Sequence, residues 1–342
     1  MSRPAAGPAP GRSCRERLDP AARPWADALA ASFPDLGRSV TDAREARRIL
    51  AAAPRPPAPA PPVGAVVDRT VPGPPGAPPV PVRIYLPDPR RWPGPRPTVV
   101  FCHGGGWVLC DLDTHDTTAR NLARASGAAV VSVDYRRAPE HPFPAAAEDA
   151  HAVLRWAGEH AGELGGDARA LVVAGDSAGG NLAAASLLLA RERGGPPVAL
   201  QVLVCPVLDL GRERRSYRTC AEGGFLTATH MRWFRGQYLG PGGDGRHPLA
   251  SPLRADPAGL PPAHVVVAGC DPLRDEGVAY HRRLERRGIP SFLDTHPGMF
   301  HGFLGFSAAL PQAHEALLRL GGAISSTLKN RKTSGGVGGA TG

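Results

Sequence analysis

Short apolar runs alternate with segments of helical periodicity along most of this 342-residue chain, and this alternation constrains the fold more than any other feature. The apolar runs are 97–102, 128–135, 170–175, 198–205 and 263–269, and the helical segments are 113–125, 144–163, 178–193 and 275–288. Strands buried on both faces read as continuous apolar runs, and helices between them allow parallel pairing. The sequence therefore predicts an α/β fold with a mostly parallel central sheet and helices on both faces.

The remaining segments are expected to surround this sheet. Residues 65–71, 80–87 and 289–296 have the composition of strands, and 308–327 that of a last helix. The alternation is interrupted from 207 to 262, which indicates a helical insertion over one edge of the sheet. The expected organisation is a loose N-terminal tail, cap helices and a proline-rich linker (1–60), a main domain (61–328) with a cap insertion at about 207–245, and a disordered tail (329–342).

The charge of the chain does not indicate a nucleic-acid partner. The formal net charge is +9, but the arginines are scattered rather than gathered in a basic patch. No apolar stretch approaches the roughly 18 residues that span a bilayer, and the N-terminus lacks the apolar core of a secretory signal. The six cysteines form no Cys-x-x-Cys pair, so free thiols in a reducing cytoplasm are expected.

Residues 172–181 read VVAGDSAGGN and place Ser177 between a predicted strand and a predicted helix. Gly175 and Gly179 lie two residues on either side, which suits a serine on a sharp, strained turn. The start of the helix would direct free N–H groups at developing negative charge. The motif therefore predicts a nucleophilic serine, with a glycine-rich packing turn as the alternative. Asp176 is expected to anchor the turn by hydrogen bonds to nearby backbone.

A second motif, HGGGW at 103–107, follows another predicted strand. Three consecutive glycines let the backbone approach a ligand closely and turn its N–H groups inward, as the oxyanion of acyl transfer requires. A phosphate-binding loop is the alternative, but the motif lacks both the Gly-Lys-Ser/Thr ending and the G-x-G-x-x-G spacing. The acids at 111–116 fit no zinc or EF-hand pattern, so no metal site is expected.

An activated serine needs a base, and the base needs an acid that orients it. Asp271 directly follows a predicted strand, whereas Asp275 and Glu276 would lie in the first turn of the next helix. Asp271 is therefore the favoured acid, with Asp275 as the alternative. His301 lies in a loop ahead of the last helix and is the favoured base, while His296 ends a predicted strand and is interpreted as structural.

Taken together, HGGGWV, YRRAPEHPFPAAAEDA, GDSAGGN, DPLRDEG and the closing HGF resemble the bacterial hormone-sensitive-lipase-like carboxylesterases, which have the α/β-hydrolase fold. The resemblance runs from about residue 60 to 325. It implies that Ser177 is the nucleophile, Asp271 the acid and His301 the base. It also implies that the N–H groups of Gly105, Gly106 and Ala178 form the oxyanion hole, and that Glu140 braces the loop below it.

The resulting hypothesis is a cofactor-free serine carboxylesterase that hydrolyses short- to medium-chain acyl esters. Candidate substrate-binding residues are Trp107, Phe225 and Phe234. The aromatic residues 233, 234 and 238 are equally consistent with an acyl pocket or with the insertion's own core. A deacylase or amide hydrolase for one biosynthetic metabolite is the nearer alternative, and a non-catalytic binding protein is the more distant one. The expected partner is a small-molecule ester, a homodimer is possible, and no membrane insertion is expected.

Overall fold

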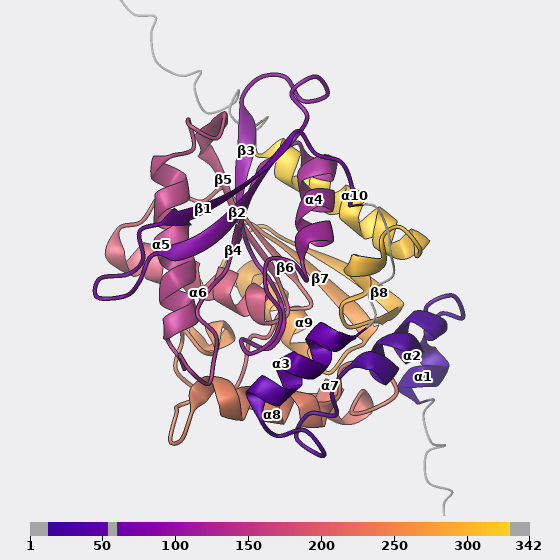
Figure 1. The fold of residues 1–342 in the computed structure, drawn as a ribbon. Coiled ribbons are helices and arrows are strands. Elements are labelled where there is room, and N and C mark those ends of the chain that lie inside the picture. The colour runs from indigo at the N-terminus through magenta and orange to yellow at the C-terminus, as the bar shows by residue number, and fades with distance from the viewer. Residues whose placement is uncertain (1–12, 54–59, 329–342) are drawn as a thin grey trace, which may run out of the picture.

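The computed structural model describes residues 13–53 and 60–328, which form one eight-stranded sheet covered by helices (Figure 1). The strand order is β1-β2-β4-β3-β5-β6-β7-β8. The pairs β1–β2 and β2–β4 are antiparallel and all the others are parallel. The strands are β1 (Ala65–Val71), β2 (Val80–Leu86), β3 (Arg96–Cys102), β4 (Ala129–Val133), β5 (Gly166–Asp176), β6 (Leu200–Val204), β7 (Ala263–Cys270) and β8 (Ser291–Phe300).

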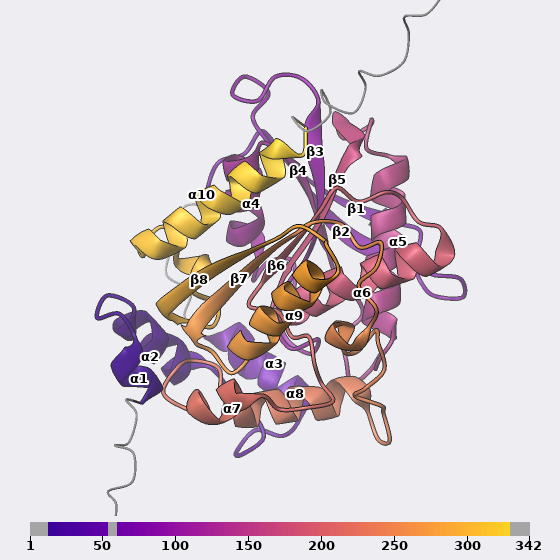
Figure 2. The same cartoon turned by 180° about the vertical axis from the view of Figure 1, so that it is seen from behind.

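Helices cover both faces of the sheet, as predicted. One face carries α4 (Asp116–Ser126) and α10 (Pro311–Ser326), and the other carries α5 (Ala145–Glu159), α6 (Ala178–Arg193) and α9 (Arg274–Arg286). Successive side chains of a strand point to opposite faces of the sheet. On β3, Val99 and Phe101 therefore pack on the side of α4 and α10, and Val100 and Cys102 pack on the side of α5, α6 and α9. Figure 2 shows α9 in front of β6 and β7. Burial on both faces explains why these strands read as unbroken apolar runs.

The N-terminal segment and the insertion lie together on one side of the molecule (Figure 1). Their helices are α1 (Cys14–Arg17), α2 (Arg23–Ser32), α3 (Ala43–Ala52), α7 (Arg215–Thr219) and α8 (Ala228–Leu239). The Trp233 indole N–H on α8 donates to the carbonyl of Thr41 just before α3, at 2.9 Å. Arg38 pairs with Glu222 at 2.7 Å. These contacts join two segments that are far apart in the sequence into one layer.

The N-terminus departs from the expected loose tail. Cys14 and Leu18 on either end of α1 are each only 2 % exposed, because both side chains pack against the sheet's last strands. The tail before residue 13, half of the proline-rich linker of 53–64 (residues 54–59) and the tail at 329–342 lie outside the described residues. All six cysteines are free thiols. Within 13–53 and 60–328, no helix is both long and apolar enough to cross a membrane.

Candidate active site

Ser177 occupies a tight turn between β5 and α6. Its φ of 56° and ψ of −119° are strained for a residue with a side chain, and such strain concentrates at functional sites. The turn is held because the Ser177 N–H donates to the carbonyl of Val204 at 2.8 Å. A Cβ at Gly175 would collide with the backbone of Gly179, and one at Gly179 with the backbone of Cys102. The spacing of the two glycines is therefore a steric requirement of the turn.

Ser177, His301 and Asp271 form a continuous hydrogen-bonded chain. The Nε2 atom of His301 lies 3.0 Å from Ser177 Oγ, and its Nδ1 lies 2.8 Å from Asp271 Oδ2. The other oxygen of Asp271 accepts the Leu273 N–H at 2.8 Å. Ser177 is 8 % exposed, His301 is 7 % and Asp271 is 0 %. The three side chains come from the carboxyl ends of β5, β7 and β8, which lie at one edge of the sheet because β5, β6, β7 and β8 pair in parallel.

The alternative acid and base lie elsewhere. Asp275 pairs with Arg274 at 2.8 Å and accepts the Ser216 N–H at 2.9 Å. His296 lies inside β8, because this strand continues to Phe300 instead of ending at 296, and there it contacts Asp294 at 3.2 Å. His301 is the first residue after the extended strand. The structure thus brings Asp271 and His301, not Asp275 or His296, to Ser177.

The surroundings of His301 favour its protonated form. Burial lowers the pKa of its imidazole, but the charge of Asp271 and the hydrogen bond to it outweigh burial. The net effect raises the pKa of His301 above its ordinary value. The imidazolium that forms when the ring takes a proton is therefore stabilised in place.

The glycine loop, residues 103–107, lies beside Ser177 and has two backbone N–H groups without an acceptor among the described residues. Gly105 has a φ of +107° and Gly106 one of +62°, conformations that favour glycine. Within the described ranges, no acceptor pairs with the N–H of either residue. The loop is held by Asp176, whose Oδ1 accepts the Gly104 N–H at 3.0 Å while its Oδ2 contacts His115 at 3.4 Å. The sequence predicts that Asp176 bonds the backbone of its own turn, but the backbone group that its side chain accepts from is the Gly104 N–H of the glycine loop.

A second brace comes from the N-terminal layer. The Arg47 guanidinium on α3 contacts Glu140 at 2.7 Å and donates to the carbonyls of Val108 at 2.8 Å and Ala138 at 2.7 Å. Glu140 therefore holds an arginine that in turn holds the end of the glycine loop. The sequence alone gave no signal for Arg47, because nothing in a helical arginine shows which carbonyls it reaches.

An apolar pocket of about 270 Å³ opens onto Ser177 and His301. Three separate parts of the chain provide its aromatic and aliphatic walls, which are Leu29 and Phe33 of the N-terminal layer, Phe225, Met231 and Phe234 of the insertion, and Leu304 and Phe306 after His301. The rings of Phe33 and Phe225 pack edge to face, with their centroids 4.9 Å apart. Of the predicted substrate-binding residues, Phe225 and Phe234 lie in this wall.

Trp107 does not line the pocket, which corrects the prediction for this residue. The consecutive positive φ angles of Gly106 and Trp107, 62° and 61°, turn the indole away from Ser177. It is fully buried and stacks on Tyr238, with ring centroids 4.1 Å apart and planes inclined by 5°. Of the three aromatic residues of α8, Phe234 thus belongs to the pocket and Tyr238 to the core.

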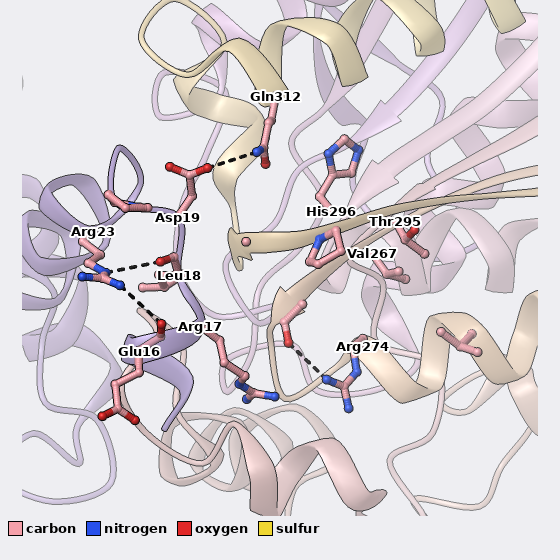
Figure 3. Close-up of a pocket in the computed structure, with 15 residues that line it drawn as sticks. Glu16, Arg17, Leu18, Asp19, Arg23, Val267, Arg274, Thr295, His296 and Gln312 are labelled. Atoms are coloured by element: carbon pink, nitrogen blue, oxygen red, sulfur yellow. Dashed lines mark hydrogen bonds between the residues drawn. The ribbon is translucent and has the colours of Figure 1, made fainter. Parts of the chain in front are cut away.

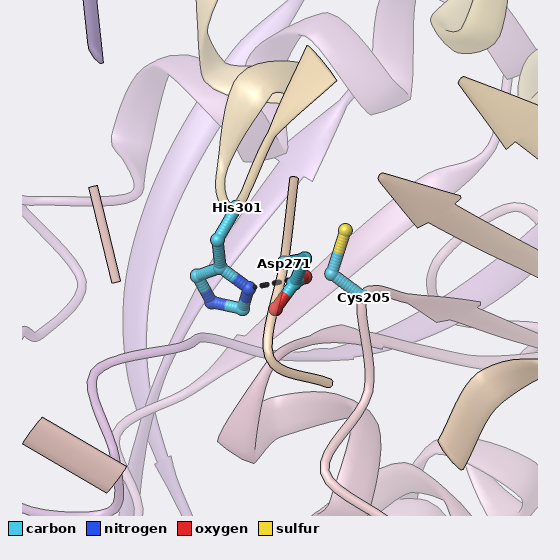
Figure 4. Close-up of side chains that lie close together, drawn as sticks. All are labelled: Cys205, Asp271 and His301. Carbon is cyan, nitrogen blue, oxygen red and sulfur yellow. Dashed lines mark hydrogen bonds and ion pairs between the residues drawn. The ribbon is translucent and has the colours of Figure 1, made fainter. Parts of the chain in front are cut away.

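Cys205 is a neighbour of Asp271 that the sequence analysis did not identify. It follows β6 with a φ of +45°, and its Sγ lies within 4.8 Å of a carboxylate oxygen of Asp271 and a ring nitrogen of His301. Figure 4 shows the His301 ring directed at Asp271, with Cys205 on the opposite side of that carboxylate. Burial and the charge of Asp271 raise the pKa of the Cys205 thiol. These residue types can bind zinc, but here Asp271 and His301 are bonded to each other.

Comparisons with known proteins agree with this geometry. A family model described as the alpha/beta hydrolase fold matches residues 99–305. Carboxylesterase NlhH of Mycobacterium tuberculosis is 45% identical over 242 residues, which cover 69% of this chain and 75% of that protein. Ethyl acetate hydrolase of Pseudomonas putida is 41% identical over 70% of this chain and 76% of its own. The solved esterase of Pyrobaculum calidifontis is 43% identical with a TM-score of 0.74, covering 78% and 86%.

Proposed function

Because the chain belongs to the hormone-sensitive-lipase-like esterase family of the α/β-hydrolase fold, we propose that it is a serine carboxylesterase acting on short- to medium-chain acyl esters. The observation that carries the proposal is the hydrogen-bonded chain from Ser177 through His301 to Asp271, which opens onto an apolar pocket. An ester carbonyl that enters this pocket meets a serine hydroxyl already bonded to a base.

In the first half of the reaction, Ser177 forms an ester with the substrate's acyl group. His301 Nε2 takes the hydroxyl proton as Oγ attacks the carbonyl carbon, and Asp271 holds the ring so that Nδ1 keeps its proton. The tetrahedral oxyanion accepts hydrogen bonds from the unused N–H groups of Gly105 and Gly106 and from the N–H of Ala178. Ala178 begins α6, so its N–H needs no helical partner and the positive end of the helix dipole faces the charge. His301 then protonates the leaving alcohol.

In the second half, water hydrolyses the acyl-enzyme by the same route. His301 takes a proton from water, hydroxide adds to the acyl carbon, and the same three N–H groups stabilise the second oxyanion. Collapse of this intermediate returns the proton to Ser177 Oγ and releases the carboxylic acid. No redox step or group carrier is needed for either half.

The pocket supports an acyl chain of limited length as the substrate group. Its walls are aromatic and aliphatic, so burial of each methylene in them is favourable by about 0.8 kcal/mol. Its volume of about 270 Å³ lies at the small end of ligand pockets, which sets an upper limit on the chain it encloses. Both observations favour short and medium acyl esters over long-chain lipids.

A series of p-nitrophenyl esters from acetate to laurate tests this proposal. We expect kcat/KM to rise from the acetyl ester to a short or medium chain and then to fall, because methylenes are added until the pocket is filled. Labelling by a fluorophosphonate probe should go to Ser177, since only an activated serine reacts. Labelling together with poor turnover of every simple ester would instead favour a deacylase or amide hydrolase for one metabolite. No labelling and no turnover would favour a binding protein.

Activity should fall with decreasing pH through one protonation step. His301 must be neutral to accept the Ser177 proton, and Asp271 raises its pKa, so kcat/KM should decline below a midpoint that lies above the ordinary histidine value of about 6.5. A kcat/KM profile between pH 5 and 9 measures this midpoint. His103 beside the glycine loop does not contribute, since burial lowers its pKa to about 3. Unchanged kcat/KM down to pH 5 would contradict the role given to His301.

We also propose a cytoplasmic location, which the six free thiols support because disulfides are rare in that compartment. The homodimer and the absence of nucleic-acid binding stay predictions from the sequence.

A further inference from the structure

Three cysteines from distant parts of the chain meet at the edge of the sheet, outside the pocket described above. Cys14 begins α1, Cys220 follows α7, and Cys270 is the last residue of β7. None is more than 2 % exposed, and all three belong to the same apolar cluster. The remaining cysteines have no role in this group, which we call the thiol cluster.

Cys14 is the member of the thiol cluster that contacts both others. The Cys270 thiol donates to the carbonyl oxygen of Cys14 at 3.0 Å, and the thiol of Cys14 interacts electrostatically with the thiols of Cys220 and Cys270. The Cys220 thiol has other hydrogen-bond partners. It donates to the carbonyl of Gly269 at 3.6 Å and accepts from the Arg17 guanidinium at 3.2 Å. Cys270 is therefore the member whose thiol contacts the backbone of Cys14 directly.

The surroundings of the cluster shift the pKa values of Cys14 and Cys270 in opposite directions. The interaction with Cys14 lowers the pKa of Cys270 by more than burial raises it. The positive charges of Arg17 and Arg274 also lower this pKa. For Cys14, the interaction with Cys220 favours the thiolate, but the interaction with Cys270 and burial outweigh it and raise the pKa to about 11. The thiolate is the nucleophile of disulfide exchange, so Cys270 is the member suited to attack.

A cavity lies beside the thiol cluster, although none of the three cysteines lines it. This cavity of about 800 Å³ is lined by Arg17, Gly269 and Arg274, which lie next to the cysteines (Figure 3). Figure 3 shows the side chains of Arg17 and Arg274 at this cavity, and both carry positive charge. In addition, α1 is a single turn anchored by Cys14 and Leu18, and short elements of this kind open locally at low cost.

We propose that Cys14 and Cys270 are an oxidisable thiol pair, which a low-molecular-weight disulfide such as oxidised glutathione converts into a bond that joins α1 to the end of β7. The Cys270 thiolate attacks one sulfur of the reagent and releases one small thiolate, which leaves a mixed disulfide. Cys14 sulfur, having given up its proton, then displaces the second small thiolate. The protein loses two protons and two electrons, and the reagent takes up both and is reduced to two thiols.

The bond would tie together two parts of the pocket's frame. Cys270 directly precedes Asp271, and α1 is followed by α2, whose Leu29 and Phe33 line the pocket. A covalent link between residues 14 and 270 also removes conformational freedom from the unfolded chain, which raises the free energy of unfolding. The inference is independent of the proposed esterase activity, because it concerns chemistry of the thiols alone.

The test is oxidation of the full-length protein by glutathione disulfide, followed by trypsin digestion without reduction and mass spectrometry. We expect peptide 13–15 to be linked to peptide 255–274, with a mass two hydrogen atoms below their sum, and Tm to rise by roughly 5 °C. Dithiothreitol should reverse both changes. Cys220→Ser is the matched control, since it alters the same cluster but should still form the link.

Three outcomes would overturn the proposal. The first is a wild-type protein whose Cys14 and Cys270 stay reduced, and the second is a link from either residue to peptide 219–232, which holds Cys220. The third is a linked protein with unchanged or lower Tm, since the bond would then not act as a staple. Because the peptide map is made on wild-type protein, it holds even if Cys14→Ser or Cys270→Ser fails to fold.

Discussion

Replacing Ser177 by alanine should lower ester hydrolysis by roughly 10⁴-fold or more, down to the turnover that the oxyanion donors and the pocket provide alone. In the proposed reaction this hydroxyl forms the acyl-enzyme, and its removal leaves His301 without the proton it accepts. The loss should appear in kcat, with KM little changed, because the apolar pocket wall is untouched. Initial rates on p-nitrophenyl butyrate, at enzyme concentrations raised to detect slow turnover, measure it.

The matched control for this variant is Ser186→Ala. Ser186 lies on the same helix, α6, is fully buried, and donates to the carbonyl of Ala183 at 2.8 Å, away from the pocket. Its variant should keep the wild-type rate and should still react with a fluorophosphonate probe. A Ser177→Ala enzyme that turns over the ester at the wild-type rate would show that another group is the nucleophile.

Much of the fold could be predicted because burial on both faces leaves a simple pattern. The apolar run at 97–102 appears as β3, with alternate residues in the two cores. What the pattern could not give was the end of β8, since PGM at 297–299 lacks the composition of a strand, and yet β8 pairs with β7 up to Phe300. The structure of the segment around α1 also depends on packing by residues that are distant in the sequence. Cys14 and Leu18 are buried by parts of the chain that no local pattern specifies.

The site was more predictable than its surroundings. Ser177, Asp271 and His301 each follow a predicted strand, and parallel strands bring their carboxyl ends to one edge of the sheet. The direction of Trp107 depended on two backbone angles after the glycines, which residue types alone do not determine. Cys205 was missed for another reason, because its nearness to Asp271 arises only from the pairing of β6 with β7.

Replacing Asp271 by asparagine should lower kcat by roughly 10⁴-fold, although the side chain keeps its size. The reason lies in the second hydrogen bond of the carboxylate. Its Oδ1 accepts the Leu273 N–H at 2.8 Å, so the amide oxygen of asparagine will take that position and the NH₂ will face His301. His301 Nδ1 must then be unprotonated to accept from the NH₂, and the ring proton moves to Nε2.

That tautomer cannot act as the base, because Nε2 already carries a proton where it must accept one from Ser177. The variant also lacks the negative charge that stabilises the imidazolium, so both effects of Asp271 are lost together. The measurement is kcat and KM on the same butyrate ester, with Tm as a check on folding. KM should stay near the wild-type value, since Asp271 is fully buried and does not line the pocket.

Asp275→Asn is the control for this variant. Asp275 lies four residues further along the chain and carries the same charge, but it pairs with Arg274 and the backbone of Ser216 instead of His301. Its variant should keep most of the activity, because neither the tautomer of His301 nor the charge beside it changes. If Asp275→Asn lost more activity than Asp271→Asn, the acid of the catalytic chain would be Asp275, and the contact between Asp271 and His301 would not be the one that supports the base.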